Sequence, residues 1–254
     1  MENRTIIKTS KLSKTFSHEG VQQHVLKNVD LEIKEHEFTV IMGSSGAGKS
    51  TLLYALSGMD KPSLGQVEVD GENIVKMNEN ELAIFRRKHC GFVFQQIYLL
   101  DNMSVMDNVI VSGLLTSKDR KEIAKKARNL FSKIKISSVT WHKFPAQISG
   151  GEAQRAGIVR ALINEPVVLF ADEPTGALDQ ESGTAVLDIL TDVAKEGQTV
   201  VMVTHDLKSA RRADRIIYLK DGNICGELRL SQYTGENDKK RNETLIGFLE
   251  EMGW

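Results

Sequence analysis

One glycine-rich segment constrains the fold of this chain more than any other feature of its sequence. The segment is Gly43-Ser44-Ser45-Gly46-Ala47-Gly48-Lys49-Ser50, between an apolar run at residues 38–42 and a helical pattern at residues 51–57. A strand, a loop of this spacing and a helix together form the P-loop pattern. Its glycines let successive backbone N–H groups point at phosphate, and the following helix adds the positive end of its dipole. The segment therefore predicts a nucleotide-binding site.

Individual residues of the loop have distinct expected roles. We expect Lys49 to reach the β and γ phosphates of the nucleotide and Ser50 to bind Mg²⁺ through its hydroxyl. The other loop residues, and Thr51 at the start of the helix, are expected to line the phosphates. The loop by itself does not identify the activity, because kinases, GTPases and many motors share it.

Short apolar runs elsewhere indicate a parallel α/β sheet. Residues 38–42, 167–171 and 200–204 are almost continuously apolar, which is typical of strands covered on both faces. Asp70-Gly71 and Asp221-Gly222 lie beside alternating segments and predict hairpin turns. We therefore expect an α/β fold with a P-loop NTPase (RecA-like) core and an additional antiparallel β subdomain.

An inserted helical subdomain is expected at about residues 98–163, where the strand pattern is absent. Within it, residues 117–136 carry apolar side chains at helical spacing. The outer face of that helix is basic; its cations are Lys118, Arg120, Lys121, Lys125, Lys126, Arg128, Lys133 and Lys135. We interpret this face as solvated, with attraction to anionic lipid or to a partner as the alternative.

The C-terminal residues 231–254 are expected to form an extension to a main domain that covers residues 1–230. In this extension, Leu245, Phe248, Leu249 and Met252 share one stripe of an amphipathic helix. We expect the stripe to pack on its own domain; docking on a partner is the alternative.

Composition excludes several classes of function. The 33 basic and 34 acidic residues leave little net charge, so no nucleic-acid partner is expected. Cys90 and Cys225 are far apart and have no CxxC or His/Cys cluster, so neither a disulfide framework nor a zinc site is expected. The N-terminus lacks a signal-peptide pattern. Because a membrane-spanning helix needs about 20 apolar residues, we expect none in this sequence.

Two adjacent carboxylates follow the apolar run at residues 167–171. Asp172 is expected to hold Mg²⁺, directly or through water, as the acidic residue of a P-loop site does. Glu173 is the candidate general base that polarises the water attacking the γ-phosphate. Acidic pairs at strand ends are also common as solvated turn residues, but the P-loop in the same chain favours the catalytic interpretation.

A second helix start has the features of an anion-binding site. Ser149-Gly150-Gly151-Glu152 precedes a helical run at residues 153–163, so hydroxyl and backbone donors converge on one point. One ATP molecule needs only one such cradle. The second one therefore predicts that this surface covers nucleotide held by another copy of the chain.

This pattern resembles the signature sequence, usually LSGGQ, of the ATP-binding-cassette (ABC) family. The resemblance covers about residues 5–230 and implies further roles. Gln95 matches the glutamine that senses Mg²⁺ and the attacking water, and Asp179 matches the loop that crosses the dimer interface. His205 matches the histidine that contacts the γ-phosphate, and Phe16 lies where the family places an aromatic side chain against adenine.

Two residues depart from the usual signature. Ile148 replaces leucine, and Glu152 replaces glutamine and so adds a negative charge near the opposed nucleotide. We expect little loss of activity. The glutamate resembles the lipoprotein-releasing branch, and the wider sequence is similar to the macrolide-efflux, lipoprotein-releasing and bacitracin-resistance group.

The resemblance implies an ATPase subunit that powers a separate integral-membrane permease. It implies ATP and Mg²⁺ as cofactors, a homodimer that encloses ATP, and a cytoplasmic location on the inner face of the membrane. Export of, or resistance to, antimicrobial peptides, lipoproteins or drugs is the expected process. The alternatives are a non-transporting signalling ATPase of the cell-division type and a DNA-repair or ribosome-associated ATPase.

Overall fold

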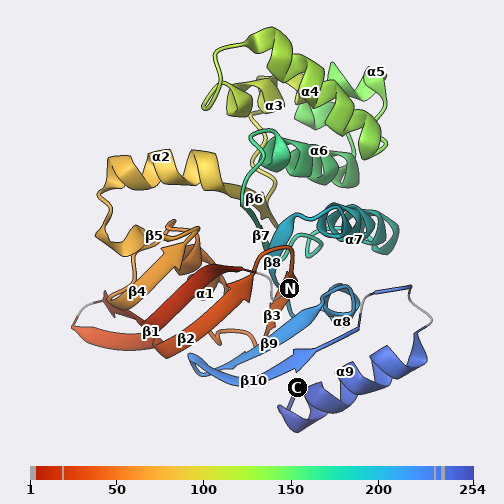
Figure 1. Ribbon diagram of the computed structural model, residues 1–254. Coiled ribbons are helices and arrows are strands. Elements are labelled where there is room, and N and C mark those ends of the chain that lie inside the picture. The colour runs from red at the N-terminus through yellow and green to blue at the C-terminus, as the bar shows by residue number, and fades with distance from the viewer. Residues whose placement is uncertain (1–3, 19, 232, 236–237) are drawn as a thin grey trace. The chain divides into compact units, whose positions relative to one another are not determined.

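The computed structural model describes residues 4–18, 20–231, 233–235 and 238–254 (Figure 1). The chain divides into two compact units. The first unit combines Met1–Leu82 with Ala194–Trp254, and the second is Ala83–Val193. Within the described residues, no helix is both long enough and apolar enough to cross a bilayer.

An antiparallel sheet in the first unit has the strand order β2-β1-β4-β5. Its strands are β1 (Thr5–His18), β2 (Val21–Lys34), β4 (Leu64–Val69) and β5 (Glu72–Asn73), and the 3₁₀ turn η1 (Ile74–Lys76) and the helix α2 (Glu79–His89) follow them along the chain. Asp70 and Gly71 join β4 to β5 with φ angles of 52° and 81°. Both positive angles fit a type I′ turn, so this predicted hairpin is confirmed.

The central strands of the first unit have the order β10-β9-β3-β8. They are β3 (Phe38–Met42), β8 (Thr199–Val203), β9 (Arg215–Lys220) and β10 (Asn223–Arg229), with the helices α1 (Lys49–Leu56) and α8 (Leu207–Ala210). β3 runs parallel to both β8 and β9, and β3 and β8 are buried along their whole length. The expected doubly covered strands are therefore present, and Asp221-Gly222 forms the second predicted hairpin.

The C-terminal helix α9 (Lys239–Glu251) packs on its own unit, as the apolar stripe predicts. Leu245 and Leu249 are fully buried, and a Cβ atom on Gly226 of β10 would lie 2.5 Å from the Met252 sulfur. Arg241 donates hydrogen bonds to the carbonyls of Arg211, Ala213 and Ser231. A buried guanidinium with several acceptors holds α9 in one position.

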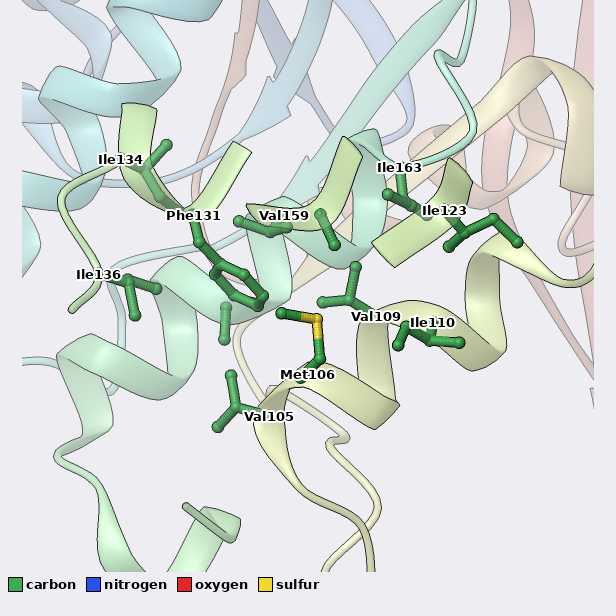
Figure 2. Close-up of a cluster of buried hydrophobic side chains, with 12 residues drawn as sticks. Val105, Met106, Val109, Ile110, Ile123, Phe131, Ile134, Ile136, Val159 and Ile163 are labelled. Carbon is green, nitrogen blue, oxygen red and sulfur yellow. The ribbon is translucent and has the colours of Figure 1, made fainter. Parts of the chain in front are cut away.

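The second unit contains a parallel strand pair and a helical core. β6 (Cys90–Phe94) pairs with β7 (Val168–Asp172). The helices are α3 (Val105–Gly113), α4 (Arg120–Lys133), α5 (Ser138–Trp141), α6 (Gly150–Leu162) and α7 (Gln180–Lys195), with the 3₁₀ turn η2 (Pro145–Gln147). Figure 2 shows Met106 and Phe131 pointing into the cluster of buried side chains from α3, α4 and α6. This core fixes α6, the helix that begins at the signature sequence.

The two cysteines differ in their surroundings. Cys90 begins β6, and burial raises the pKa of its thiol to about 12. Cys225 lies on β10 and is exposed. Neither forms a disulfide.

Candidate nucleotide-binding and hydrolysis site

The P-loop lies between β3 and α1, and close packing explains two of its glycines. A Cβ atom on Gly43 would lie 2.1 Å from the carbonyl oxygen of Leu219. On Gly48 it would lie 2.9 Å from the Val25 carbonyl oxygen, and both glycines have positive φ angles, 152° and 101°. A side chain at either position would clash with these carbonyl oxygens. Because glycine has no side chain, the backbone can curve tightly here before the helix starts.

The turn between β9 and β10 supports the loop from behind. Gly222 in that turn donates its N–H to the carbonyl of Ala47 at 3.3 Å and accepts one from Lys27 of β2 at 2.9 Å. A Cβ atom on Gly222 would lie 2.4 Å from the Val25 carbonyl oxygen, so glycine is needed here as well. The predicted hairpin thus also positions the P-loop.

Lys49 is mostly buried and points back into the loop. Its ammonium group donates to the carbonyls of Gly43 and Ser44, both at 2.9 Å. The position of Gly46 faces open space, since a Cβ atom there would meet no atom within 4 Å. A phosphate chain fits this loop. It would meet the curved backbone, the Lys49 ammonium and the N-terminal end of α1.

His205 and the P-loop follow neighbouring parallel strands. Ile41 of β3 pairs with Val203 of β8, and the Thr204 N–H donates to the Ile41 carbonyl at 3.2 Å. The P-loop begins two residues after Ile41, and His205 lies two residues after Val203. The first unit therefore brings His205 and the P-loop to the same end of its parallel strands, where ligands of α/β sheets gather.

Phe16, the candidate adenine-stacking residue, lies on β1 and is 44% exposed. It pairs with Gln23 of β2, two residues before Val25, the residue that touches the P-loop. The Lys14 ammonium lies 4.9 Å from the centre of the Phe16 ring. An exposed ring on the strand next to β2 can accept a base on its free face.

In the second unit, the acid pair and Gln95 lie at adjacent strand ends. Phe94 at the end of β6 pairs with Asp172 at the end of β7, so Gln95 and Glu173 both follow directly. Glu173 has a φ angle of 45°, which is uncommon for a residue with a side chain. Gln95 lies over Gly176, where an added Cβ atom would be 2.9 Å from the Gln95 amide nitrogen. These predicted residues are therefore brought together.

The signature sequence starts α6 with a reciprocal capping box. Ser149 Oγ accepts the Glu152 N–H at 3.2 Å, and Glu152 Oε2 accepts the Ser149 N–H at 3.0 Å. Thr140 of α5 donates its hydroxyl to Glu152 Oε1 at 3.1 Å. These bonds hold the pKa of the Glu152 carboxyl below its usual range, and the bond from the Ser149 N–H has the largest effect. The Ser149 hydroxyl proton remains available for an external acceptor.

Glu152 illustrates what the sequence interpretation missed. Its charge was expected near the opposed nucleotide, but the sequence interpretation did not predict that the carboxylate would bond the start of its own helix. Serine followed three residues later by glutamate is the capping-box pattern, so the sequence did contain the signal. Glutamine, the usual family residue at this position, can make the same contact.

The second helix start lies against the loop that carries Asp179. A Cβ atom on Gly151 would lie 2.6 Å from the Ser182 hydroxyl, and one on Gly150 would lie 3.5 Å from Leu178. Asp179 Oδ1 accepts the Ser182 N–H at 2.9 Å, which lowers the pKa of the Asp179 carboxyl. The glycines of the signature therefore allow α6 and α7 to begin side by side.

We expect Glu152→Ala to destabilise the protein by about 0.5–2 kcal/mol, the usual value of a helix cap, and Glu152→Gln to destabilise it less at pH 7, because glutamine can keep the hydrogen bonds and lacks only the charge. The folded-state pKa of Glu152 is lowered, so the stability from its charge is present above the unfolded pKa of about 4.3 and is lost as pH falls through the folded value. Thermal unfolding between acid and neutral pH measures this.

The comparison between wild type and Glu152→Gln separates the effect of the Glu152 charge on stability from the effects of the other carboxylates. Their difference in unfolding free energy should stay constant above about pH 5 and change only at lower pH. A difference in unfolding free energy that varies between neutral pH and about pH 5 would contradict the assignment.

Comparison with known proteins identifies the family of this chain. A family model described as ABC transporter matches residues 26–176. The chain therefore belongs to the ABC transporter family, and its fold is that of the ATP-binding cassette, the domain that binds and hydrolyses ATP in that family. The expected P-loop NTPase core is confirmed.

Two curated relatives have similar identity but different lengths. The bacitracin export ATP-binding protein BceA of Halalkalibacterium halodurans is 41% identical over 249 residues, covering 96% of this chain and 98% of that protein. The macrolide export ATP-binding/permease protein MacB of Shewanella sp. strain ANA-3 is 41% identical over 225 residues, covering 89% of this chain. The chain spans only 34% of that macrolide exporter.

A solved relative has the same fold over most of the chain. The ATP-binding cassette MJ0796, as a dimer in a post-hydrolysis state with ADP and phosphate, matches with a TM-score of 0.83. It is 38% identical, and the match covers 90% of this chain and 100% of that one.

Proposed function

We propose that this chain is the ATP-hydrolysing subunit of an ABC transporter that works as a face-to-face homodimer and drives a separate membrane permease. The relatives named for bacitracin export and macrolide export support export as the process. The cargo in this proposal is antimicrobial peptides, lipoproteins or drugs. A subunit of this kind would act in the cytoplasm, on the inner face of the membrane.

The observation that carries the proposal is the presence of two glycine-flanked helix starts whose N–H groups suit a phosphate. One is the glycine-rich loop before α1, and the other is Ser149 at the start of α6. The capping box uses the oxygen of Ser149 as an acceptor, which leaves its proton and the first N–H groups of α6 for a phosphate. A second copy of the chain would supply that phosphate, and the dimeric state of the similar solved cassette agrees with this.

The side chains divide the chemistry between them. Lys49 binds the β and γ phosphates, while His205 contacts the γ-phosphate and Gln95 orients the attacking water. Glu173 accepts the proton of that water as it attacks. Phe16 stacks on adenine. Hydrolysis removes the phosphate that joins the two copies, so the dimer opens and the opening is transmitted to the permease.

The residues available for a metal ion fit Mg²⁺. Ser50 offers a hydroxyl, Asp172 a carboxylate and Gln95 an amide carbonyl, so the proposed set consists of hard oxygen ligands. Mg²⁺, when bound, neutralises charge on the phosphate oxygens. In the proposal, Ser50, Asp172 and Gln95 hold it.

The shared site predicts that turnover depends on the concentration of the chain. Below the dissociation constant of the dimer, the hydrolysis rate per chain should fall about tenfold for each tenfold dilution, because the active dimer follows mass action. Steady-state phosphate release measured over a dilution series, with light scattering for the oligomeric state, tests this. The Lys49→Ala protein provides the background rate. A rate per chain that stays constant where only monomer is present would reject the proposal.

A further inference from the structure

Gln154 carries a buried amide on α6, two residues beyond Glu152 of the capping box. Its side chain is 1% exposed. Its amide nitrogen donates to the carbonyl of Phe94 at 2.9 Å and to the carbonyl of Pro174 at 2.8 Å. Both N–H hydrogens of the amide are therefore used, and their acceptors belong to two segments that are far apart in the sequence.

The two acceptors lie next to the groups that the proposed function uses. Phe94 is the last residue of β6 and directly precedes Gln95, and Pro174 directly follows Glu173. A single amide group on α6 therefore bridges the two segments where the paired strands β6 and β7 end. Shifting either carbonyl away from the amide would leave a buried donor without an acceptor, which is unfavourable.

The contacts of Gln154 lie where regular strand structure ends, in a turn that also has a hydrogen bond from the Gly176 N–H to the Glu173 carbonyl at 3.0 Å. Glu173 has a φ angle of 45° and lies past the end of β7, and Gln95 lies past the end of β6. Residues in a sparsely populated conformation keep it only where their surroundings fix it. The Gln154 amide adds a hydrogen bond from α6 to this turn, through the Pro174 carbonyl.

The same amide connects these strand ends to the signature sequence. α6 begins at Gly150 and its first turn carries the capping box of Ser149 and Glu152. Gln154 lies five residues after Ser149, a rise of about 7.5 Å along a rigid helix. A displacement of the helix start would therefore move the amide that holds the carbonyls of Phe94 and Pro174.

We propose that Gln154 is a positioning residue that couples the start of α6 to the placement of Gln95 and Glu173. This inference rests on the proposed function, since it assigns Gln154 no contact with nucleotide of its own. It acts through the two carbonyls it holds. When α6 binds the phosphate of the opposite copy, Gln154 sets the geometry in which Glu173 and Gln95 meet the attacking water.

Gln154→Met tests the proposal, because methionine has similar length and no hydrogen-bond donor. We expect kcat to fall by about 10- to 100-fold, because a misplaced catalytic group reduces the rate by this much. The KM for ATP should stay within about twofold of wild type. The matched control is Thr191→Val, which removes one buried hydrogen bond, from the Thr191 hydroxyl to the Leu187 carbonyl on α7. That variant should lower the melting temperature without lowering kcat.

Hydrogen exchange separates positioning from general destabilisation. In Gln154→Met, amides at residues 95–97 and 175–178 should exchange faster, while those of α7 should not change. If Gln154→Met does not fold, Gln154→Asn keeps an amide that is too short to hold both carbonyls, and it is measured in the same way. A kcat within twofold of wild type in a folded variant, or exchange that rises equally in α7, would overturn the inference.

The Glu173→Gln variant distinguishes failure of this inference from failure of the proposed function. If Glu173→Gln retains turnover, the assignment of the base is wrong and the role given to Gln154 falls with it. If Glu173→Gln is inactive and Gln154→Met behaves like Thr191→Val, only the role of Gln154 is rejected. If the inference holds, adding Gln154→Met to Glu173→Gln should lower the residual rate by less than about twofold, because both changes affect one step.

Discussion

Glu173→Gln should bind ATP normally, but its hydrolysis rate should fall by a factor of at least about 10² to 10⁴, as it does when a general base is lost. The amide has the size of the carboxylate, but it cannot accept the proton of the attacking water. The variant should therefore accumulate as an ATP-bound dimer. Phosphate release gives the rate, and size-exclusion chromatography with and without ATP gives the dimer.

Glu181→Gln is the matched control for that experiment. Glu181 lies in the first turn of α7 and is exposed, and the substitution makes the same chemical change eight residues further along the chain. It should hydrolyse ATP at the wild-type rate. Turnover of Glu173→Gln close to that of Glu181→Gln would show that another group accepts the proton.

Mixing two inactive variants should restore activity if each nucleotide is shared between two copies. Lys49→Ala removes the phosphate-binding cation, and Ser149→Ala removes the hydroxyl at the opposed helix start, so each homodimer lacks both sites. A mixed dimer has one site with both changes and one with neither. An equal mixture that exchanges freely should therefore regain about a quarter of the wild-type sites, since half the dimers are mixed.

The result depends on the dimer exchanging subunits, so the two proteins are mixed without nucleotide and activity is followed over time. Mixing either variant with itself is the control. Activity that never exceeds the sum of the two separate proteins, under conditions in which labelled chains do exchange, would contradict the shared site. Wild-type-like turnover by Ser149→Ala alone would contradict it as well.

The central strands were predictable because their apolar runs are short and nearly continuous. Residues 38–42 match β3, and the runs at 167–171 and 200–204 match β7 and β8 with shifts of one residue. The long strands β1 and β2 were not predicted. Their pairing shifts register between Thr9 and Leu12, and Lys11 and Asn28 have positive φ angles, so the alternation of apolar and polar residues is interrupted.

The site could be predicted where motif spacing alone determines it. The P-loop, the acid pair and the signature helix each lie where a strand or helix boundary puts them. The role of Gln154 could not be predicted, because it depends on which face of α6 meets the ends of β6 and β7. Periodicity over residues 153–163 shows a buried helix but does not show what lies opposite a polar residue within it.

The contrast between the two thiols gives this chain a natural labelling position. Maleimides and similar reagents attack the thiolate, and a thiol with a pKa of about 12 is ionised to roughly one part in 10⁴ at pH 8. Cys90 therefore reacts too slowly to compete with exposed Cys225. A fluorophore attached to the unaltered chain would report from β10, a strand whose hairpin turn supports the phosphate-binding loop.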